Sequence, residues 1–409
     1  MGKKICILTF GCQMNERDSE VLMGLLRNKG FVFVDAPTEA DVVIFNTCSV
    51  RKHAEDKVFS EIGRVVKQTR YSKKNLPLAK SDTYIHKKPY IGVVGCMAQL
   101  YKEKIFERSP LVDFVVGPSD IEKIPALLER FFSSEKTTTG SQLYTYKIWY
   151  TEGNKRSPSI YHTKWYNDKS HFYVVISEGC SKFCSYCVVP YTRGPLRHRD
   201  YRDILREIKQ AIDIGLKRLT LLGQNVSSYV YLNSFSPDKC VTFTDLLEIV
   251  NGLEGLDEIS FITSHPGDTT VSLFETMRKC QKVKKYLHLP VQSGSNKILE
   301  RMNRGYTKEF YLELVKKYRD ILPEGVLTTD IIVGFPGETE RDFDETYQLV
   351  KQVRFDAAYI FKYSPRPYTQ AATFIDDVPE DEKKRRHTKI LALQKKISLA
   401  KKQGQRENR

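Results

Sequence analysis

The chain has 409 residues, of which 41% are hydrophobic and 28% charged, a composition typical of a soluble protein with about two domains. No apolar run approaches the roughly 20 residues that a membrane span requires, and the N-terminus lacks the apolar segment of a secretory signal, so we expect a cytoplasmic protein without a membrane partner. The net charge of +15 favours a polyanionic partner, RNA or DNA, although such a charge also serves solubility alone.

Strand-like and helix-like patterns alternate over the first part of the chain. Strands are expected at residues 5–9, 31–34, 42–45, 90–94 and 114–116. Helices are expected at residues 16–28, 51–67 and 121–132, with another between the last two strands. These repeated strand–helix–strand units predict an α/β domain at residues 1–135, with an open, doubly wound parallel sheet and helices on both faces.

Three of the nine cysteines follow predicted strands of this domain. Cys12, Cys48 and Cys96 each lie just past the carboxyl end of a strand, at the edge where open α/β sheets bind ligands. In a reducing compartment these cysteines do not indicate disulfides, so their convergence indicates a metal site or catalysis. Three independent buried thiols are the alternative interpretation.

Two segments interrupt the alternation. Residues 67–90 are polar, basic and unpatterned, and we interpret them as a surface insertion. Residues 136–170 are rich in Ser, Thr, Gly, Lys and Tyr and are predicted to form a linker. The linker is expected to fold in part, because it contains the strand-forming residues Tyr144, Tyr146, Ile148, Trp149 and Tyr150.

A second domain is predicted at residues 171–380. Its strands are expected at residues 172–176, 218–222, 258–262, 285–289, 326–333 and 357–361. Its helices are expected at residues 201–214, 244–252, 270–279, 308–319 and 340–352. Six strand–helix units in this length predict a partial (β/α)6 barrel rather than a full eight-fold barrel. Residues 381–409 are predicted to form a basic helix, with Ile390, Leu393 and Ile397 on one face, and a polar tail.

Cys180, Cys184 and Cys187 follow the first strand of the second domain with the spacing Cys-x3-Cys-x2-Cys. Thiolates are the ligands of iron–sulfur clusters, and this spacing lets one loop hold three corners of a cubane. Three ligands leave one iron open for a cofactor. The alternative is a zinc site, with His198 as the fourth ligand of a closed tetrahedral set.

This spacing, with an aromatic residue before the last cysteine, resembles the signature of radical-SAM enzymes, and the surrounding residues look like the methylthiotransferase family. The matching segments are Gly11–Asn15, Asn46–Cys48, Gly95–Gln99, Tyr186–Gly194, Leu222–Val226, Leu287–Gly294, Asp330–Thr339 and Tyr363–Pro367. The resemblance is strongest to the tRNA-2-methylthio-N6-dimethylallyladenosine synthases, because Ser293-Gly294 follow the Pro-x-Gln segment where the ribosomal-protein branch has a histidine.

The resemblance implies that a methylthio group is transferred to C2 of N6-dimethylallyl-adenosine next to the tRNA anticodon, with two S-adenosylmethionine molecules consumed. It implies a radical-generating [4Fe–4S] cluster at Cys180, Cys184 and Cys187, whose open iron binds S-adenosylmethionine. It also implies a sulfur-carrying auxiliary [4Fe–4S] cluster at the other three cysteines, Cys12, Cys48 and Cys96.

The resemblance also implies cofactor-binding residues, which stand after barrel strands at the face where barrel sites form. They are Tyr186, Gln224, Asn225, Gln292, Ser293, Asp330 and Gly334. Turn and cap roles are the alternative for these residues. Arg193 is expected to meet the cofactor carboxylate or a tRNA phosphate, and we interpret His265 and His288 as structural.

Basic runs at residues 70–74, 282–285, 383–386 and 395–396 are expected to follow the tRNA backbone, although any one of them is compatible with a solvated face. A reductant protein of the flavodoxin or ferredoxin type and an iron–sulfur carrier are the other implied partners of a monomer. The family's C-terminal RNA-binding β-barrel is expected to be absent from this chain.

Other functions remain compatible with the sequence. The nearest are methylthiotransferases that act on threonylcarbamoyl-adenosine in tRNA or on an aspartate of a ribosomal protein. A non-catalytic iron–sulfur electron-transfer protein belongs to another class, but electron carriers have their irons fully ligated by cysteine. The third is an RNA-binding scaffold with zinc.

Overall fold

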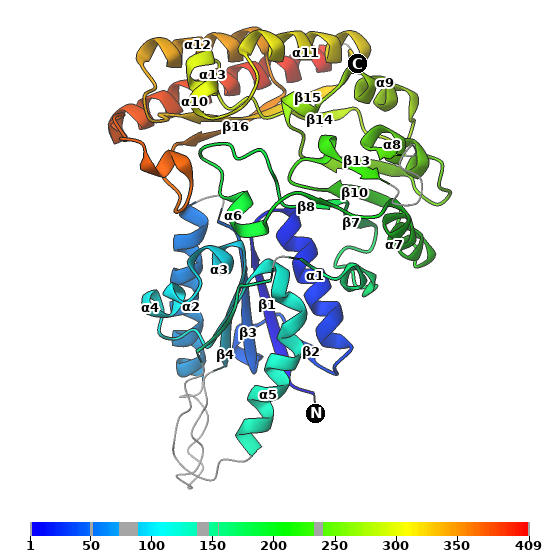
Figure 1. The fold of residues 1–409 in the computed structure, drawn as a ribbon, viewed down its shortest axis with the longest axis vertical. Coiled ribbons are helices and arrows are strands. Elements are labelled where there is room, and N and C mark those ends of the chain that lie inside the picture. The colour runs from blue at the N-terminus through cyan, green and yellow to red at the C-terminus, as the bar shows by residue number, and fades with distance from the viewer. Residues whose placement is uncertain are drawn as a thin grey trace. The chain divides into compact units, whose positions relative to one another are not determined.

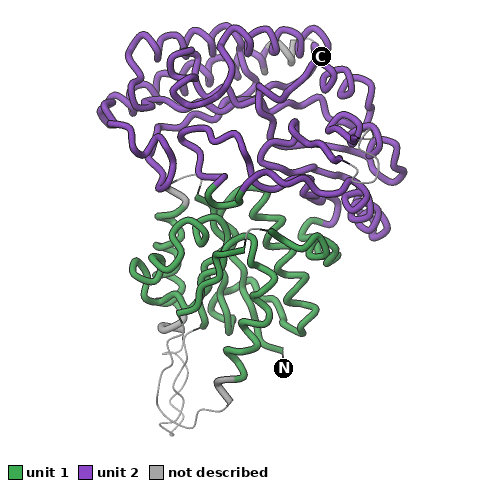
Figure 2. Tube along the Cα trace, in the orientation of Figure 1, with its two compact units in different colours: residues 1–168, 191–194 green, residues 169–190, 195–409 purple. Residues whose placement is uncertain are grey.

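The computed structural model of the chain describes residues 2–49, 52–72, 89–136, 147–153, 155–232 and 240–407. The chain forms two compact units (Figure 2). Unit 1 comprises Met1–Asp168 and Tyr191–Gly194, and unit 2 comprises Lys169–Pro190 and Pro195–Arg409. Among the described residues, no helix is both long and apolar enough to cross a membrane.

Unit 1 contains a six-stranded parallel sheet in the order β2-β1-β3-β4-β5-β6. Its strands are β1 (Lys4–Phe10), β2 (Val32–Phe33), β3 (Val42–Thr47), β4 (Tyr90–Gly95), β5 (Phe114–Val116) and β6 (Ile148–Tyr150). Its helices are α1 (Gln13–Arg27), α2 (Lys52–Ser72), α3 (Cys96–Tyr101), α4 (Lys104–Arg108) and α5 (Ile124–Lys136), with short 3-10 turns η1 (Pro37–Glu39), η2 (Pro118–Lys123) and η3 (Pro158–His162).

Helices cover both faces of this sheet (Figure 1). All residues of β3 and β4 are buried, as expected for central strands of a parallel sheet. Because side chains alternate along a strand, Val43 and Phe45 of β3 pack toward Val58 of α2 on one face. On the other face, the ring of Phe131 in α5 meets Phe114 of β5 edge-on, with centroids 6.0 Å apart.

The doubly wound parallel sheet predicted from the sequence is confirmed, with one addition at its edge. Residues 148–150, assigned above to the linker 136–170, form β6 and pair in parallel with β5. The pairing gives β5 a second partner strand. Residues 147–168 accordingly belong to unit 1. Tyr144, Tyr146 and residues 73–88 of the predicted insertion lie outside the described residues, and the first residues of that insertion continue α2.

Unit 2 contains two three-stranded parallel sheets, β13-β10-β7 and β14-β15-β16. Their strands are β7 (His171–Val175), β10 (Arg218–Leu222), β13 (Glu258–Ile262), β14 (Tyr286–His288), β15 (Val326–Val333) and β16 (Ala357–Lys362). Two antiparallel pairs are formed by β8 (Ser177–Glu178) with β9 (Arg197–His198) and by β11 (Val230–Leu232) with β12 (Cys240–Thr242).

Helices alternate with the parallel strands of unit 2. They are α6 (Val189–Arg193), α7 (Tyr201–Asp213), α8 (Phe243–Asn251), α9 (Val271–Lys279), α10 (Asn296–Arg301), α11 (Lys308–Ile321), α12 (Glu340–Val353) and α13 (Glu380–Glu407), with 3-10 turns η4 (Val226–Ser228), η5 (Pro266–Asp268) and η6 (Gln370–Thr373). A parallel bridge between Ile259 and Val283 joins the two sheets, so the six strands follow one another in chain order. This arrangement confirms the partial (β/α)6 barrel.

The C-terminal helix α13 is part of the barrel wall and lies beside α12 and β16 (Figure 1). Its residues Ile390 and Ile397 are buried. Gln394 Nε2 donates to the carbonyl of Phe355 at 2.9 Å, and Lys401 pairs with Asp356 at 2.7 Å. The helix predicted as a basic extension is therefore fastened to the segment that leads into β16.

We expect Gly294→Ala to destabilise unit 2 by about 2 kcal/mol, measured as a lower urea midpoint. Gly294 follows β14, and a Cβ there would lie 2.6 Å from the Cα of Thr346 and 2.7 Å from the carbonyl oxygen of Glu345, both in α12. Gly252, at the end of α8, has a φ of −75° and no atom closer than 3.4 Å to an added Cβ. Gly252→Ala is the matched control and should leave the midpoint unchanged or raise it slightly. Equal midpoints for both variants would contradict the close approach at Gly294.

Candidate functional site

Unit 1 places Cys12, Cys48 and Cys96 at the carboxyl ends of three neighbouring strands. Cys12 caps the N-terminus of α1, Cys48 follows β3 directly, and Cys96 is the first residue of α3 after β4. The strands β1 and β3 are adjacent, and the helices that follow them lie on opposite faces of the sheet (Figure 1). Such a reversal opens a crevice in which α/β sheets bind ligands.

Two buried asparagines hold the loops after β1 and β3 together. Asn15 Nδ2 donates to Asn46 Oδ1 and to the Thr47 carbonyl, both at 3.1 Å. Asn46 Nδ2 donates to the Asn15 carbonyl at 2.8 Å and to Ser19 Oγ at 2.9 Å. The side-chain oxygen of Asn15 also accepts from the backbone N–H of Cys12 at 3.3 Å. These bonds fix where Cys12 and Cys48 lie.

The third loop is brought close by Gly95. Its φ is +92°, and a Cβ at this position would lie 2.5 Å from the carbonyl oxygen of Thr47. Only glycine adopts this backbone at no cost and leaves that space free. The loop that carries Cys96 therefore lies directly against the loop that carries Cys48.

The three thiols of unit 1 have different acidities. The pKa of Cys12 is lowered to about 6, chiefly by a hydrogen bond from Cys48. The positive charge of Arg193 also lowers it, whereas burial acts in the opposite direction. Burial raises the pKa of Cys96, again with Arg193 acting in the opposite direction. A buried arginine therefore already acts on two of the three thiols.

Arg193 is held by Asp18 at the centre of a buried ion cluster. Asp18 is 3% exposed and accepts from Arg156 at 2.6 Å and from Arg193 at 2.7 Å. Burial opposes ionisation of Asp18, but the two guanidinium groups hold its pKa below the ordinary value. Arg193, itself 5% exposed, bonds Asp18 and lies close enough to Cys12 and Cys96 to act on their charge.

Unit 2 carries Cys180, Cys184 and Cys187 on the loop that follows β8. The N–H of Cys187 donates to the Cys184 carbonyl at 2.8 Å, which closes a tight turn. Burial, together with the neighbouring Cys184 and Cys180, raises the pKa of Cys187 to about 12. The thiols are therefore close enough to repel one another as thiolates, and a bound cation would reverse this effect.

Sequence reasoning missed the segment that holds this loop, residues 301–304 at the end of α10. The Met302 carbonyl accepts from Ser185 N at 2.9 Å, and Asn303 Nδ2 donates to the Phe183 carbonyl at 2.9 Å. Arg304 Nη1 lies 3.3 Å from the sulfur of Cys184. No helix was expected at residues 296–301, so no signal in the sequence pointed to this segment.

Buried polar atoms gather at the carboxyl ends of the barrel strands. Among the described residues, five such atoms that follow β7, β10, β13 and β14 have no hydrogen-bond partner: Ser177 Oγ, Gln224 Oε1, Ser264 Oγ, His265 Nε2 and Gln292 Oε1. Buried polar groups in native proteins are normally paired. These side chains therefore fit a polar small molecule, such as a nucleoside cofactor, at this face of the barrel.

The other predicted cofactor residues are engaged within unit 2. Asn225 Nδ2 donates to Asp268 at 2.5 Å, and Asn225 Oδ1 accepts from the backbone of His265 at 3.1 Å. Ser293 Oγ lies 3.2 Å from Thr346 Oγ1. Asp330 Oδ2 lies 3.3 Å from His288 Nε2, and the hydroxyl of Tyr186 lies 3.3 Å from Arg304. Asn225 and Ser293 thus bond to other side chains of unit 2, whereas the side-chain oxygens of Gln224 and Gln292 have no hydrogen-bond partner among the described residues.

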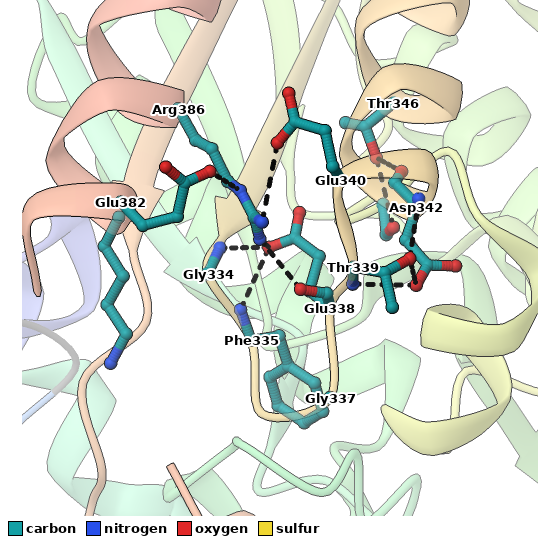
Figure 3. Close-up of polar contacts among 12 residues, drawn as sticks. Gly334, Phe335, Gly337, Glu338, Thr339, Glu340, Asp342, Thr346, Glu382 and Arg386 are labelled. Atoms are coloured by element: carbon teal, nitrogen blue, oxygen red, sulfur yellow. Dashed lines mark hydrogen bonds and ion pairs between the residues drawn. The ribbon is translucent and has the colours of Figure 1, made fainter. Parts of the chain in front are cut away.

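The turn that begins at Gly334 is shaped by the C-terminal helix (Figure 3). The carboxylate of Glu338 accepts from the N–H of Gly334 and, at 3.2 Å, from that of Phe335. Arg386 of α13 donates to the Glu338 carbonyl at 2.9 Å and is held by Glu382 at 2.7 Å. Burial raises the pKa of Glu338 to about 7, although Arg386 opposes this. Two residues of α13 therefore fix the turn after β15.

Several lysines and arginines of the predicted basic runs are paired inside unit 2. Lys383 is 4% exposed and bonds Asp376 at 2.6 Å. Lys285 donates to the Cys280 carbonyl at 2.8 Å, and Lys284 pairs with Glu258 at 2.7 Å. The runs at 282–285 and 383–386 thus contribute less free positive charge than the sequence suggested.

Each donor set consists of three cysteines, the ligand type of iron–sulfur clusters. Among the described residues, no three His, Cys, Asp or Glu side chains converge as they do around a single metal ion. His198, the alternative zinc ligand, packs edge-on against Tyr229 with ring centroids 5.4 Å apart. Three thiolates with one position left open are instead the ligand set of a cluster with one free iron.

Comparisons with known sequences agree with this geometry. The profile of the Radical SAM superfamily matches residues 174–350, and that of the Uncharacterized protein family UPF0004 matches residues 4–117. The tRNA-2-methylthio-N(6)-dimethylallyladenosine synthase of Carboxydothermus hydrogenoformans is 42% identical over 97% of this chain and 84% of its own length. The synthase of the same name from Natranaerobius thermophilus is 43% identical over 97% of this chain and 82% of its own length.

Solved structures share the fold. The radical S-adenosylmethionine methyltransferase TsrM from Kitasatospora setae, with cobalamin and a [4Fe-4S] cluster bound, matches 91% of this chain and 74% of its own with a TM-score of 0.57 and 11% identity. The cobalamin-dependent S-adenosylmethionine radical enzyme OxsB matches 97% of this chain and 56% of its own with a TM-score of 0.53 and 13% identity.

Alkylation of the metal-free chain should separate the thiols by acidity. We expect the rate at Cys12 to rise through pH 6 and then level off, because its thiolate is fully formed above that pH, while the rate at Cys187 keeps rising beyond pH 9. Iodoacetamide pulses followed by peptide mass spectrometry measure both. Cys48→Ala removes the hydrogen bond to Cys12 and should raise the pH at which the alkylation rate of Cys12 is half-maximal. A native midpoint near the ordinary thiol value of about 8.5 would contradict this account.

Asp18→Asn should destabilise unit 1 by about 3–5 kcal/mol, because it removes the buried carboxylate that both Arg156 and Arg193 contact. Chemical denaturation at neutral pH measures the loss. Since folding lowers the pKa of Asp18, its contribution is complete at neutral pH and disappears as the pH falls below about 3.9, the unfolded value. Glu129→Gln, which breaks an exposed pair with Lys29, is the control and should cost less than about 1 kcal/mol. A loss at Asp18 no larger than this control would show that the ion cluster is not needed for folding.

Proposed function

The chain belongs to the family of tRNA-2-methylthio-N(6)-dimethylallyladenosine synthases, and we propose that it transfers a methylthio group to C2 of N6-dimethylallyl-adenosine next to the tRNA anticodon. It is a radical-SAM transferase that uses two [4Fe–4S] clusters and S-adenosylmethionine. The observation that carries the proposal is the pair of three-cysteine sets. One set lies at the carboxyl ends of three parallel strands of unit 1, and the other lies on a single loop of unit 2 that follows β8.

The two sets of cysteines have separate roles in this proposal. Cys180, Cys184 and Cys187 hold the cluster that binds the cofactor, and Cys12, Cys48 and Cys96 hold the auxiliary cluster that carries the sulfur. Together the bound groups supply radical chemistry, which the unactivated C–H bond at C2 of adenine requires and acid–base side chains do not provide. The residues 1–135 are proposed as the methylthiotransferase domain and 171–380 as the radical-SAM domain, with 136–170 between them and the basic helix 381–409 after them.

The protein's own residues position the reactants. Gln224 and Gln292 offer free acceptor oxygens to the cofactor, and the turn at Gly334 is proposed to meet its adenine. Asn225, Ser293 and Asp330 are proposed to line the same face, and Tyr186 belongs to the cysteine loop itself. Asn225, Gln292 and Ser293 are buried, so polar contacts at their side of the bound cofactor act in a medium of low dielectric constant.

The partners follow from this activity. tRNA is the substrate, and the net charge of +15 suits a polyanion. A flavodoxin- or ferredoxin-type protein is proposed to supply electrons, and an iron–sulfur carrier to supply clusters. We place this activity in the cytoplasm, where tRNA is modified, and propose that a monomer performs it.

The test uses the full chain reconstituted anaerobically. We expect about eight irons per chain and a methylthio mass gain when tRNA with N6-dimethylallyl-adenosine is incubated with S-adenosylmethionine and a reductant. Iron and sulfide analysis and mass spectrometry of the nucleosides measure these results. Cys184→Ala should halve the iron and abolish product, whereas Cys240→Ala, which changes an exposed thiol in β12, should do neither.

Two outcomes would change the proposal. Eight irons with product only on threonylcarbamoyl-adenosine tRNA or on a ribosomal protein would keep the chemistry and change the substrate. Four irons or fewer in the native chain would contradict the auxiliary cluster at Cys12, Cys48 and Cys96.

A further inference from the structure

Arg304 is a buried cation in unit 2 without a carboxylate partner. Its residue is 6% exposed, and among the described residues no Asp or Glu lies within ion-pair distance of its guanidinium. Burying a charge is costly unless an opposite charge and hydrogen bonds compensate for it. Arg199 and Arg386, two other strongly buried arginines of unit 2, each contact a carboxylate. Arg304 therefore lacks its counter-ion in the protein alone.

The partners that Arg304 does have all belong to the candidate site. Its Nη1 lies 3.3 Å from Cys184 Sγ and 3.3 Å from the hydroxyl of Tyr186. Its Nη2 donates to the Pro290 carbonyl at 2.8 Å, and its Nε donates to the hydroxyl of Tyr306 at 2.9 Å. The planar guanidinium thus joins a cysteine of the proposed cluster to the segment that precedes Gln292.

Tyr306 fixes the orientation of this guanidinium. Its hydroxyl donates to the Val291 carbonyl at 2.9 Å, so the same oxygen is free to accept from Arg304. The ring of Tyr306 also packs edge-on against His265, with centroids 5.6 Å apart. Since four N–H bonds and one packed ring define its position, Arg304 has one orientation rather than several.

We propose that Arg304 is the built-in counter-ion of the cluster at Cys180, Cys184 and Cys187, and that its bond to the Cys184 sulfur raises the reduction potential of that cluster. This inference rests on the proposed function, because it requires the cluster to be present. Hydrogen bonds and positive charge at cluster sulfurs stabilise the reduced state, which carries one more negative charge than the oxidised state. Arg304 is a positioning residue, because it acts through Cys184 and the backbone of Pro290.

The test is an EPR-monitored redox titration of the reconstituted full chain. The signal of the radical-SAM cluster is identified as the one that changes when S-adenosylmethionine is added. We expect Arg304→Gln to lower the ratio of reduced to oxidised cluster at a fixed potential by about tenfold, which is 59 mV for a one-electron couple. Tyr306→Phe, which removes one acceptor of the guanidinium, should shift the ratio in the same direction by less.

Arg319→Gln is the matched control. Arg319 is on α11 of the same unit and donates to the Arg354 carbonyl at 3.2 Å, but its side chain has no described contact with a cysteine. The midpoint of this variant should equal that of the native chain. A shift as large as that of Arg304→Gln would overturn the proposal, because the effect would then not depend on the bond to sulfur.

Iron content separates the possible outcomes. If Arg304→Gln retains its iron and its reduction midpoint equals that of the native chain, the inference is overturned and the proposed function stays intact. If Arg304→Gln does not retain iron, Arg304→Lys decides, since lysine keeps the charge but cannot hold both Cys184 and Pro290. A lowered midpoint in Arg304→Lys supports the inference, whereas a native midpoint or a loss of iron there overturns it. A native chain without a cluster signal overturns the proposed function itself.

Discussion

The constraint on which both sites depend is that several thiolates must be gathered in a poorly solvated place. Like charges at close range repel strongly in a medium of low dielectric constant, so three neighbouring thiolates, of which at least one in each unit is buried, need compensating positive charge. Each unit provides it with a buried arginine beside the cysteines, Arg193 in unit 1 and Arg304 in unit 2. In unit 1, Asp18 holds two arginines, so the cluster of three side chains remains net positive. In unit 2, Arg304 has no carboxylate partner among the described residues, so the thiolates and the bound cluster are its counter-charge.

The remaining architecture brings the loops to these charges. In both units parallel strands place the loops after successive strands at one edge, so residues far apart in the chain become neighbours. Local bonds then set the final positions: Asn15 and Asn46 in unit 1, and the segment around Met302 and Asn303 in unit 2. Gly95 and Gly294 allow backbones to approach where a side chain would not fit. The cysteines are thus positioned by parallel strands and by short loops that hydrogen bonds and close backbone contacts hold in place.

The basic character of the chain has two physical roles. Three basic residues of α13 form ion pairs within unit 2, namely Lys383, Arg386 and Lys401. Arg386 also holds the turn after β15. The helix that looked like an RNA-binding extension is therefore also a wall of the barrel and a support for the cofactor face. The lysines that remain exposed, such as Lys395 and Lys396, are still available to a polyanion.

The sequence by itself determined the two α/β architectures, the approximate bounds of the parallel strands and the long helices, and both cysteine sets, because these depend on short-range periodicity and on spacing within a loop. Strand β15, for example, begins and ends at the residues that its apolar run predicts. The tertiary structure alone decided that Arg193 turns to Asp18, that Ile148–Tyr150 complete the sheet of unit 1, and that Arg304 reaches Cys184 across 120 residues. Such contacts depend on which loops the fold brings together, and no local pattern in the chain records the pairing of one buried charge with a distant partner.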